Sequence, residues 1–359
     1  YRSILLQTTT TERRNIMSHE LESAQSMIWT NEKPWHGLGI EMDPADGAIA
    51  WMKAAGMDWK VEKHPMFVTL PNGENTVVQG KKGSDFGVLI RNHGNDTFSE
   101  SDIFGPVGPE WIPVQNQDVF LFLERFCHEN GMTIETCGSL KGGTEIWGLL
   151  KFKDEFDIIK GDPMKGNLLF RSCHVWGKGN QLKLTPIRVV CNNTLTAALQ
   201  GGGGVFKMPH TVEFDATIQN KAIEALGMAN EQLDAFQEQA QFLASKPVKD
   251  EQVMEFVTEL YQPKLIISRA AENDNTPFNV DWTPTTEGVF ESVHLSPGSE
   301  LKSAKNTWWG ALNGVTYYED HMRTSHTDES NVLGSAWFGG GAKRKEEAMV
   351  LATRFVSAA

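Results

Sequence analysis

Apolar residues recur at helical spacing in several stretches of the chain. Between Asn116 and Glu129 five apolar positions fall on one face of a helix, and Asn130-Gly131 is a typical stop. These positions are Val119, Phe120, Leu123, Phe126 and Cys127. Asp43-Pro44 predicts another helix that ends near Gly56, because Asp caps a helix well and Pro suits its first position. Helices are also expected over 211–260, 306–321 and 342–356.

Extended segments with turn residues between them predict strands. Two are expected at 59–69 and 86–90, with a turn at Pro71-Asn72-Gly73 between them. Glycine-containing turns separate four more, which predict an antiparallel meander over 133–140, 145–153, 167–176 and 181–190. A short helix is expected after Asn192-Asn193-Thr194, and residues 271–305 are expected to form a long loop. The predicted fold class is α+β: an antiparallel β-meander flanked by helices, with an acidic helical insertion.

The chain is expected to divide into five parts. Residues 1–16 are interpreted as a leader or artefact before a start at Met17. Residues 17–210 are expected to form the α+β core, and residues 211–262 an acidic helical segment. Residues 263–305 are expected to be a loop or linker, and residues 306–359 to be C-terminal helices that pack back on the core.

Charge is unevenly distributed along the chain. There are 33 Lys and Arg against 46 Asp and Glu, a net charge of −13, which excludes a protein whose whole surface binds nucleic acid. Residues 141–190 nevertheless hold nine basic and five acidic residues, a net charge of +4. Residues 211–260 hold three lysines and ten acids, a net charge of −7. A local basic surface on an acidic protein is compatible with this distribution.

The four cysteines argue against a metal or disulfide framework. Cys127, Cys137, Cys173 and Cys191 form no CxxC pair and are expected in the core. Cys127-His128 and Cys173-His174 are sequence neighbours that point in different directions, so neither is placed for Cys-His catalysis. No catalytic residue, metal or cofactor is predicted. No apolar run is long enough to span a membrane and no signal peptide is recognised, so an intracellular protein is expected.

Cations in the predicted meander alternate with aromatic residues. Such a sheet face can follow a phosphate backbone while bases stack on its aromatic rings. The candidate nucleic-acid-binding residues are Lys141, Lys151, Lys153, Arg171, Trp176, Lys183 and Arg188. The alternative is a half-buried sheet with cations on its wet face and aromatic residues in the core. Strand alternation favours this alternative for Phe170 and Arg171, which point to opposite faces.

The last predicted helix offers a second candidate site. Lys343-Arg344-Lys345 fall in its expected first turn, directly after Gly339-Gly340-Gly341. Glycines, a helix N-terminus and cations together can cradle a phosphate, although the spacing is not that of a Walker loop. The alternative is a solvated turn that Glu346 and Glu347 partly neutralise.

A polar cluster of unknown role precedes that helix. Asn313 and Tyr317 share a helix face, which Asp320 or His321 continues. The members of the cluster are Asn193, Asn313, Tyr317, Asp320, His321 and Arg323. Asp320 and His321 could serve an enzyme as a base pair or as metal ligands, but the HExxH motif is absent. The alternative is a capped helix end whose polar groups bond to neighbouring backbone.

Four motifs occur in order along the chain. They are PWHGLG at 34–39, VQN at 114–116, RVVCNNTL at 188–195 and WGALNGVTYYEDH at 309–321. Together they resemble the phage/plasmid-like family that carries domain of unknown function 932, over roughly Trp29 to Val356. Gly314 departs from the pattern, which has alanine there, and it lowers helix propensity. The resemblance implies a phage or plasmid protein in a bacterial host cytoplasm, and it supplies no catalytic residues.

The leading hypothesis is a non-enzymatic protein that binds single-stranded DNA in recombination or replication. The order of helices and strands is similar to that of ring-forming single-strand annealing proteins of the Rad-fifty-two type, which is a fold-level analogy. Self-association is expected, and no membrane partner. One alternative is an interaction or virion-associated structural protein. The other is an enzyme that acts on nucleotides with Asp320 and His321.

Overall fold

The protein is described here by a computed structural model. It describes residues 26–31, 33, 39–80, 84–95, 97–188, 193–194, 206–262, 282–323 and 332–358. At 153–154, 188, 193–194, 225–230 and 332–334 the backbone alone is described. The predicted leader, most of the first motif, Cys191 and the glycine run 201–204 lie outside the described residues.

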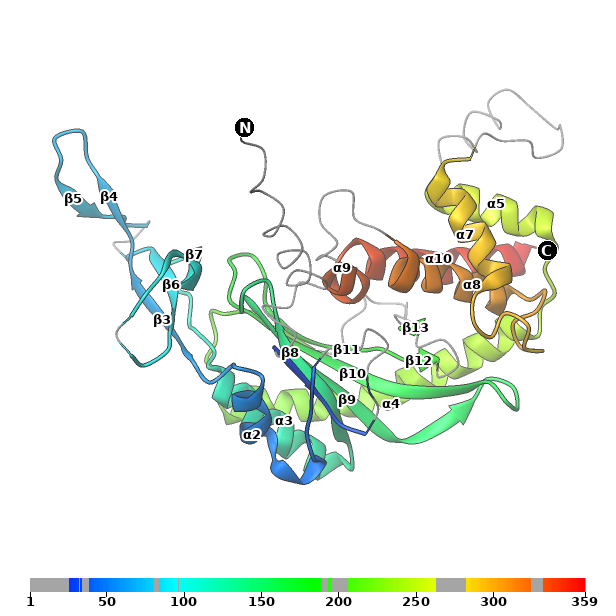
Figure 1. The fold of residues 1–359 in the computed structure, drawn as a ribbon, viewed down its shortest axis with the longest axis horizontal. Helices are drawn as coiled ribbons and strands as arrows, with labels where there is room; N and C mark the ends of the chain where they lie inside the picture. Colours follow the sequence, from blue (N-terminus) through cyan, green and yellow to red (C-terminus); the bar gives the residue numbers. More distant parts are fainter. Residues whose placement is uncertain are drawn as a thin grey trace, which may run out of the picture. The chain divides into compact units, whose positions relative to one another are not determined.

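A large sheet collects strands from distant parts of the chain (Figure 1). Its order is β13-β12-β10-β9-β8-β1-β2, with β11 beside β10 and β14 beside β11. The strands are β1 (Met27–Trp29), β2 (Ile40–Glu41), β8 (Thr133–Leu140), β9 (Glu145–Asp157), β10 (Pro163–Cys173), β11 (Asn180–Leu184), β12 (Ile187–Arg188), β13 (Asn193–Thr194) and β14 (Phe206–Met208). Described pairs are antiparallel except β1–β2. The fold class is therefore α+β as predicted, and β8 to β11 form the meander.

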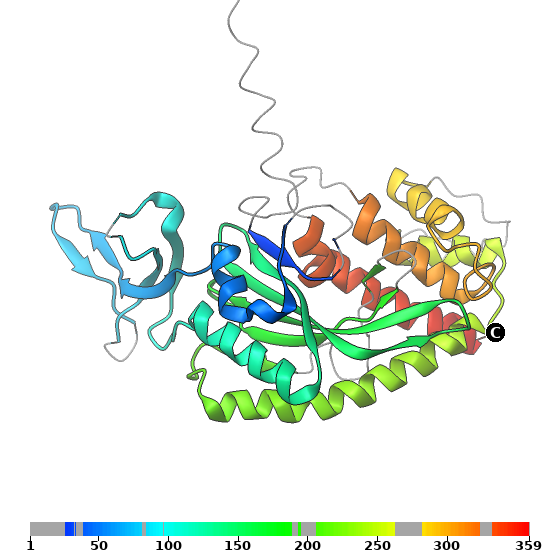
Figure 2. The ribbon, with the colours of Figure 1, turned by 60° about the horizontal axis from the view of Figure 1, so that its bottom comes forward.

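Two compact units divide the chain, and each is built from three chain segments. Unit 1 comprises residues 1–153, 168–183 and 204–227. Unit 2 comprises residues 154–167, 184–203 and 228–359. Strands β9 and β10 and the long helix α4 (Ala216–Ala244) each begin in one unit and end in the other (Figure 2).

Unit 1 carries two helices that begin and end where local signals predict. Asp43 caps the 3₁₀ turn η2 (Pro44–Asp46), and the helix then resumes as α2 (Ala48–Ala54). Gly47, at φ 83°, separates the two. Helix α3 (Asn116–Asn130) ends at Gly131 in the left-handed conformation. The apolar face predicted for this helix is buried.

Unit 1 also contains a small sheet and a projecting hairpin. The small sheet is formed by β3 (Lys60–Pro65), β6 (Gly87–Asn92) and β7 (Ile103–Val107), which follows the 3₁₀ turn η3 (Glu100–Asp102). The predicted turn Pro71-Asn72-Gly73 instead closes a hairpin of β4 (Phe67–Thr69) and β5 (Asn75–Val77). Phe67 is 59% exposed and Val68 46%, on opposite faces of this hairpin. The sequence analysis did not separate β4 from β3, and it did not anticipate β5 or β7.

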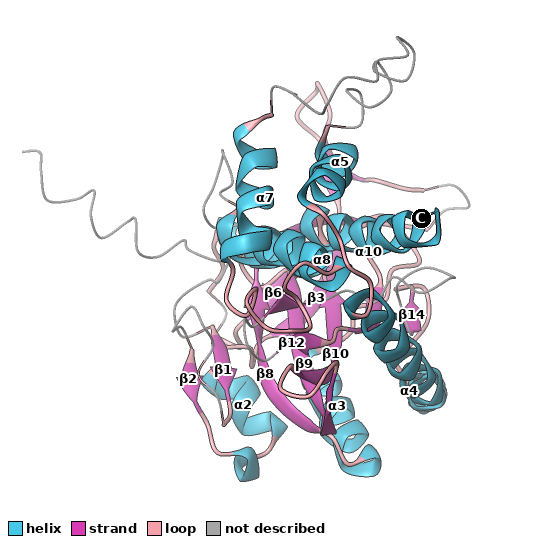
Figure 3. Ribbon diagram, turned by 90° about the vertical axis from the view of Figure 1, so that its right-hand side faces the viewer, coloured by secondary structure: helices cyan, strands magenta, loops and turns pink. Residues whose placement is uncertain are grey.

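Unit 2 is mainly helical (Figure 3). Its helices are α5 (Asp250–Tyr261), α7 (Pro284–Leu295), α8 (Trp308–Tyr317), the π-helix η4 (Tyr318–Met322), α9 (Val332–Phe338) and α10 (Gly340–Ala358), together with the end of α4. Trp308 and Trp309 are buried at the start of α8, where Trp308 contacts Phe256 and Phe355 edge-on or tilted. The aromatic residues of the 306–321 motif therefore belong to the core of unit 2.

Two segments differ from the sequence-based expectation. Helix α7 occupies much of the expected loop over 271–305, because the Thr283 hydroxyl caps it and Pro284 takes its first position. Asn193 and Thr194, expected at the start of a helix, instead form β13 opposite β12. The rest of that expected helix lies outside the described residues.

Candidate nucleic-acid interface

Two tight turns of unit 1 lie side by side at one end of the meander. The turn between β8 and β9 places Lys141 at φ 54° and Gly142 at φ 64°, the signature of a type I′ hairpin turn. The turn after β10 is closed by Lys178 N–H donating to Val175 O, with Gly177 at φ 83°. His174 N–H donates to Thr144 O at 2.8 Å and so joins the two turns.

Three cations from these turns and from β10 converge on one carboxylate. Lys178 Nζ lies 2.7 Å and Lys141 Nζ 3.4 Å from Glu145 Oε1, and Arg171 Nη2 lies 2.8 Å from Glu145 Oε2. We call Lys141, Glu145, Arg171, Trp176 and Lys178 the lysine corner. Its four charged side chains carry a formal net charge of +2 (three cations, one carboxylate). The sequence analysis included Lys141, Arg171 and Trp176 but not Glu145 or Lys178 among its sites.

Burial and charge act in opposite directions on Glu145. Its side chain is 1% exposed, and burial alone would raise its pKa. The hydrogen bond from Lys178 and the charges of Arg171, Lys141 and Lys178 outweigh burial and lower this pKa below its usual value. Glu145 therefore stays ionised at neutral pH and holds the cations together.

The outer side of the lysine corner is open to solvent. The side chains of Lys141 and Lys178 are 35% and 41% exposed, whereas that of Arg171 is 9% exposed. Trp176, two residues before Lys178, is 55% exposed, and its ring lies 5.9 Å from the ring of Phe86. The corner thus presents an aromatic face next to two accessible ammonium groups.

A buried arginine supports the turn that carries Lys141. Arg91 Nη1 donates to Gly142 O at 3.4 Å, and its guanidinium lies over the rings of Trp59 and Phe104. Arg91 Nε also donates to Asp102 Oδ1 at 2.9 Å. Hydrogen bonds from the Ser99 side chain and backbone, with a smaller effect of Arg91, hold the pKa of Asp102 well below its usual value.

The VQN motif at 114–116 holds the chain segments that lie next to the two turns. Gln115 pairs its side-chain amide with both backbone groups of Val61, at 3.0 and 2.9 Å. Asn116 donates to Met57 O at 2.9 Å, and its Oδ1 lies 3.2 Å from Nε2 of the buried His174. Burial lowers the pKa of His174 to about 3, so its ring is neutral. These contacts give the motif a positioning role beside the two turns.

The remaining predicted cations of the meander are spread over several strands. Lys151 lies on β9, and at Lys153, on the same strand, the backbone alone is described. Lys183 lies on β11, and Arg188 on β12 opposite Met164. Trp147 and Phe170 are buried, so these aromatic rings belong to the core, as the alternative interpretation holds. Trp176 is the exposed aromatic of the described meander.

The three C-terminal cations have different surroundings. Helix α10 begins at Gly340, two residues earlier than expected, so Lys343, Arg344 and Lys345 follow its first residues. Lys343 is 77% exposed and lies 3.6 Å from Glu347. Arg344 donates to Leu260 O at 2.5 Å and lies over the Tyr261 ring. Lys345 is buried and donates to Asp320 at 2.6 Å, whereas the side chain of Arg344 is 35% exposed, so Lys343 is the most accessible of the three cations.

The polar cluster of the 309–321 motif is largely internal. Asp320 is buried with Lys345, and Asn313 donates to Trp309 O at 2.8 Å within α8. Tyr317 and His321 place their rings 4.8 Å apart. Asn193 lies on β13, a strand whose backbone packs close to α8.

Glu319, which is absent from the predicted cluster, is a second buried acceptor in the π-helix η4, beside Asp320. It is buried and accepts hydrogen bonds from Tyr261 Oη at 2.8 Å and from Arg323 Nη1 at 2.6 Å. Burial, followed by the charge of Glu319, raises the pKa of Tyr261 well above its usual value. Tyr261 therefore keeps the proton that it shares with Glu319. The Glu319 carboxylate therefore connects η4 to Tyr261 of α5 and to Arg323, which directly follows η4.

The cysteines of the described residues lie in the core. Cys127, Cys137 and Cys173 are buried, and burial raises the pKa of Cys127 and of Cys173 to about 12. The described part of the chain contains no group of three His, Cys, Asp or Glu side chains placed to hold a metal ion. Within the same ranges, no helix has the length and apolar character needed to cross a bilayer.

Comparison with known proteins identifies the family. A family described as domain of unknown function (DUF932) matches residues 103–344, about two thirds of the chain. The chain belongs to the DUF932 family. The DUF932 segment begins with β7 and ends within α10, so it contains both the lysine corner and the π-helix. The PWHGLG motif at 34–39 precedes it. No curated protein and no solved structure matches this DUF932 chain.

Proposed function

We propose that this DUF932 protein is a non-enzymatic single-stranded DNA-binding protein of the annealing type. In this proposal it serves recombination or replication of a phage or plasmid in the cytoplasm of a bacterial host. The observation that carries the proposal is the exposed Trp176 beside Lys178, whose ammonium group shares Glu145 with Lys141 and Arg171.

The chemistry of the lysine corner fits a single strand better than a duplex. An exposed indole can stack on an unpaired base, which contributes about 1–3 kcal/mol per base. In a duplex the bases are already stacked on each other and are not available to Trp176. The ammonium groups of Lys141 and Lys178 can neutralise a flanking phosphate, and Glu145 keeps them at a fixed spacing before DNA arrives.

Fluorescence anisotropy with a labelled oligonucleotide tests this proposal. The intact protein should bind the single strand more tightly than a duplex, with an affinity that falls as salt rises. Lys178→Ala should lower the salt slope by about 0.7, the contribution of one phosphate contact on a single strand. Trp176→Ala should lower affinity by roughly five- to a hundredfold while leaving the slope unchanged. Lys178 is preferred to Arg171 because its side chain is 41% exposed, whereas that of Arg171 is 9% exposed and belongs to the interior of the corner.

Matched controls separate the lysine corner from general charge and exposure. Lys53→Ala removes an exposed lysine from α2, and Phe98→Ala removes an aromatic side chain that is 54% exposed. Neither should change affinity as much as its counterpart. Lys343→Ala compares the accessible C-terminal cation with Lys178. The proposal would be contradicted if Lys53→Ala and Lys178→Ala lowered DNA affinity equally, or if the intact protein bound no oligonucleotide at low salt.

A second candidate function, assembly with other copies of this chain, is favoured by the β4–β5 hairpin. Phe67, Val68 and Leu70 are all exposed, although a two-stranded hairpin with apolar residues on both faces is marginal in water. The strands β4 and β5 carry no charged residue, so two copies that meet through these strands bring no like charges of the strands together. Light scattering should show that Phe67→Thr with Val68→Thr lowers the molar mass in solution. An unchanged mass would exclude this surface.

A further inference from the structure

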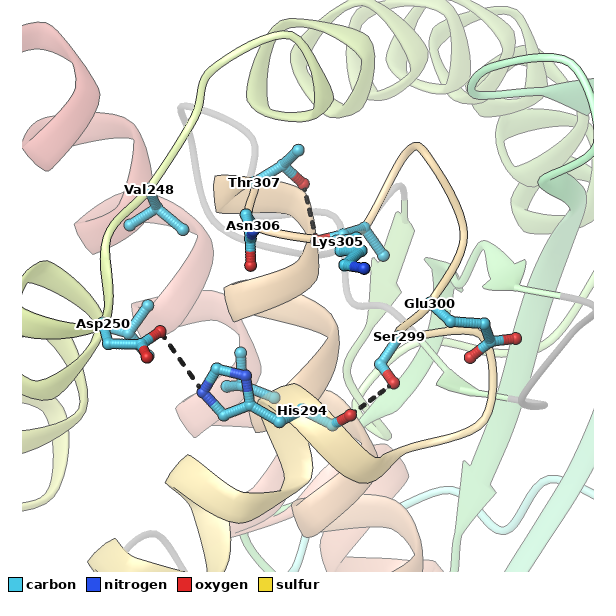
Figure 4. Close-up of a pocket in the computed structure, with 11 residues that line it drawn as sticks. Val248, Asp250, His294, Ser299, Glu300, Lys305, Asn306 and Thr307 are labelled. Carbon is cyan, nitrogen blue, oxygen red and sulfur yellow. Dashed lines mark hydrogen bonds and ion pairs between the residues drawn. The ribbon is translucent and has the colours of Figure 1, made fainter.

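A cavity of about 260 Å³ opens within the helices of unit 2 (Figure 4). It lies between the start of α5, the end of α7 and the segment 299–307 that leads into α8. Its floor is apolar and includes the buried side chains of Val248, Val253 and Ala304. The cavity is separate from the lysine corner, which belongs to unit 1.

Both signs of charge stand at the rim of this cavity. Asp250 and Glu300 supply carboxylates, and Lys305 supplies an ammonium group. Figure 4 shows Asp250 on one side of the cavity and Glu300 on the other, with Lys305 between them in this view. The His294 Nε2 atom lies 3.7 Å from Asp250 Oδ1, which is longer than a hydrogen bond. The Asp250–His294 contact therefore leaves room for another donor on that carboxylate.

Backbone contacts hold the walls of the cavity in place before any ligand arrives. Val248 N–H donates to Asn306 O at 2.9 Å, and Trp308 N–H donates to Lys246 O at 3.1 Å. The Ser299 hydroxyl donates to His294 O at 2.8 Å and fixes the end of α7. Small-molecule sites are typically preformed in this way, with an apolar lining and a few placed polar groups.

We propose that this cavity binds a small zwitterion, an α-amino acid with an aliphatic side chain. The volume equals that of roughly nine water molecules at about 30 Å³ each, which is enough to hold leucine. The ammonium group of the ligand bonds Asp250, whose contact with His294 leaves room for it, and its carboxylate bonds Lys305. Its side chain covers Val248, Val253 and Ala304.

Calorimetric titration of the full chain tests each part of this assignment. Leucine should bind saturably. The probe 3-methylbutylamine, which lacks the carboxylate, and 4-methylpentanoate, which lacks the ammonium group, should each bind about two- to fivefold more weakly. Glycine should bind about a hundredfold more weakly, because each buried methylene contributes about 0.8 kcal/mol. No saturable heat with leucine, or equal affinity for leucine and either single-charge probe, would overturn the proposal.

Variants locate the site. Lys305→Ala should weaken leucine about two- to fivefold and leave 3-methylbutylamine unchanged, because only leucine has a carboxylate for Lys305. The matched control is Lys302→Ala, which removes an exposed lysine of the same segment that does not line the cavity. Ala304→Leu fills the floor and should abolish leucine binding. Equal effects of the two lysine variants, or unchanged leucine binding in Lys305→Ala, would place the ligand elsewhere and overturn the assignment.

Discussion

The indole nitrogen of Trp309 donates a 3.1 Å hydrogen bond to Asp162 Oδ2, a carboxylate 147 residues earlier in the chain. Both side chains are buried, and the Ser303 hydroxyl donates to the same oxygen at 2.7 Å. All three residues belong to unit 2. The contact gives the tryptophan of the 309–321 motif a hydrogen-bond partner inside the core of unit 2.

Trp309→Phe should destabilise the protein by more than packing alone predicts. It removes one donor from a buried carboxylate, for which about 1.5–3 kcal/mol is the typical contribution. Trp308→Phe is the matched control, since it removes a similar volume from the same turn of α8. Urea unfolding should show the larger loss in unfolding free energy for Trp309→Phe. Equal losses would mean that the hydrogen bond contributes nothing.

Gly314→Ala should be destabilising although alanine favours helices. An added Cβ would lie 2.5 Å from Val293 Cα and 2.6 Å from Val293 N, so α7 would have to move away from α8. Overpacking of this kind costs about 1–3 kcal/mol, more than alanine gains in helix propensity. Thermal unfolding should show a lower Tm. Because two of the atoms are backbone, Val293→Ala should not restore stability.

A glycine without close neighbours provides the comparison for that variant. A Cβ at Gly108 meets nothing within 4 Å. Gly108→Ala should therefore change the unfolding free energy by no more than about 0.5 kcal/mol. A similar loss at both positions would show that the approach of α7 to α8 is not responsible.

Stability should fall below neutral pH because of His174. Its pKa of about 3 in the folded chain is below the ordinary value of 6.5, so the unfolded chain binds the proton more tightly. The unfolding free energy therefore falls as pH drops from 6.5 towards 3, by at most about 1.4 kcal/mol per pH unit. Burial lowers the pKa of His210 as well, which adds an effect of the same sign.

Urea unfolding at several pH values separates the contribution of His174. His174→Gln should flatten the dependence between pH 6.5 and 4, whatever its effect on stability at pH 7. Parallel curves for the protein and for His174→Gln would contradict the prediction.

Lys345→Met should unfold the protein more readily and should leave DNA affinity unchanged. The substitution leaves the buried carboxylate of Asp320 without its cationic partner. Breaking a buried ion pair in this way lowers the unfolding free energy by about 3–5 kcal/mol. Adding Asp320→Leu should recover part of this loss, because the unpaired charge is then gone. Lys343→Met is the exposed control and should have little effect on unfolding. A loss of DNA affinity without a loss of stability would instead indicate that Lys345 contacts a phosphate of the DNA.

Local signals explain which parts of the fold could be predicted. Helix α3 was predicted from its apolar face and from Gly131, because both signals lie within the segment itself. Strand β8 was predicted at its observed bounds for the same reason. Helix α7 was missed because a Thr-Pro start lies within a segment rich in loop-forming residues, where the loop signals outweighed the cap.

The candidate site depended on contacts that no local pattern encodes. Lys141 and Lys178 are 37 positions apart in the sequence, and only the pairing of strands brings both to Glu145. Conversely, Lys345 had the spacing of a solvent-facing cation, yet the π-helix places Asp320 against it inside unit 2. A charged side chain alone does not reveal whether its partner is an internal carboxylate or a ligand.

The passage of β9, β10 and α4 from one unit to the other has a consequence for synthesis on the ribosome. Unit 1 needs residues 168–183 and 204–227 in addition to its first 153 residues, so it cannot close until more than half of the chain has emerged. The edge of strand β9 therefore stays unpaired until later segments of the chain are synthesised. An exposed strand edge promotes aggregation, so we expect chaperones to bind the nascent chain at this stage. For the same reason, no single cut in the gene yields a fragment that contains one unit alone.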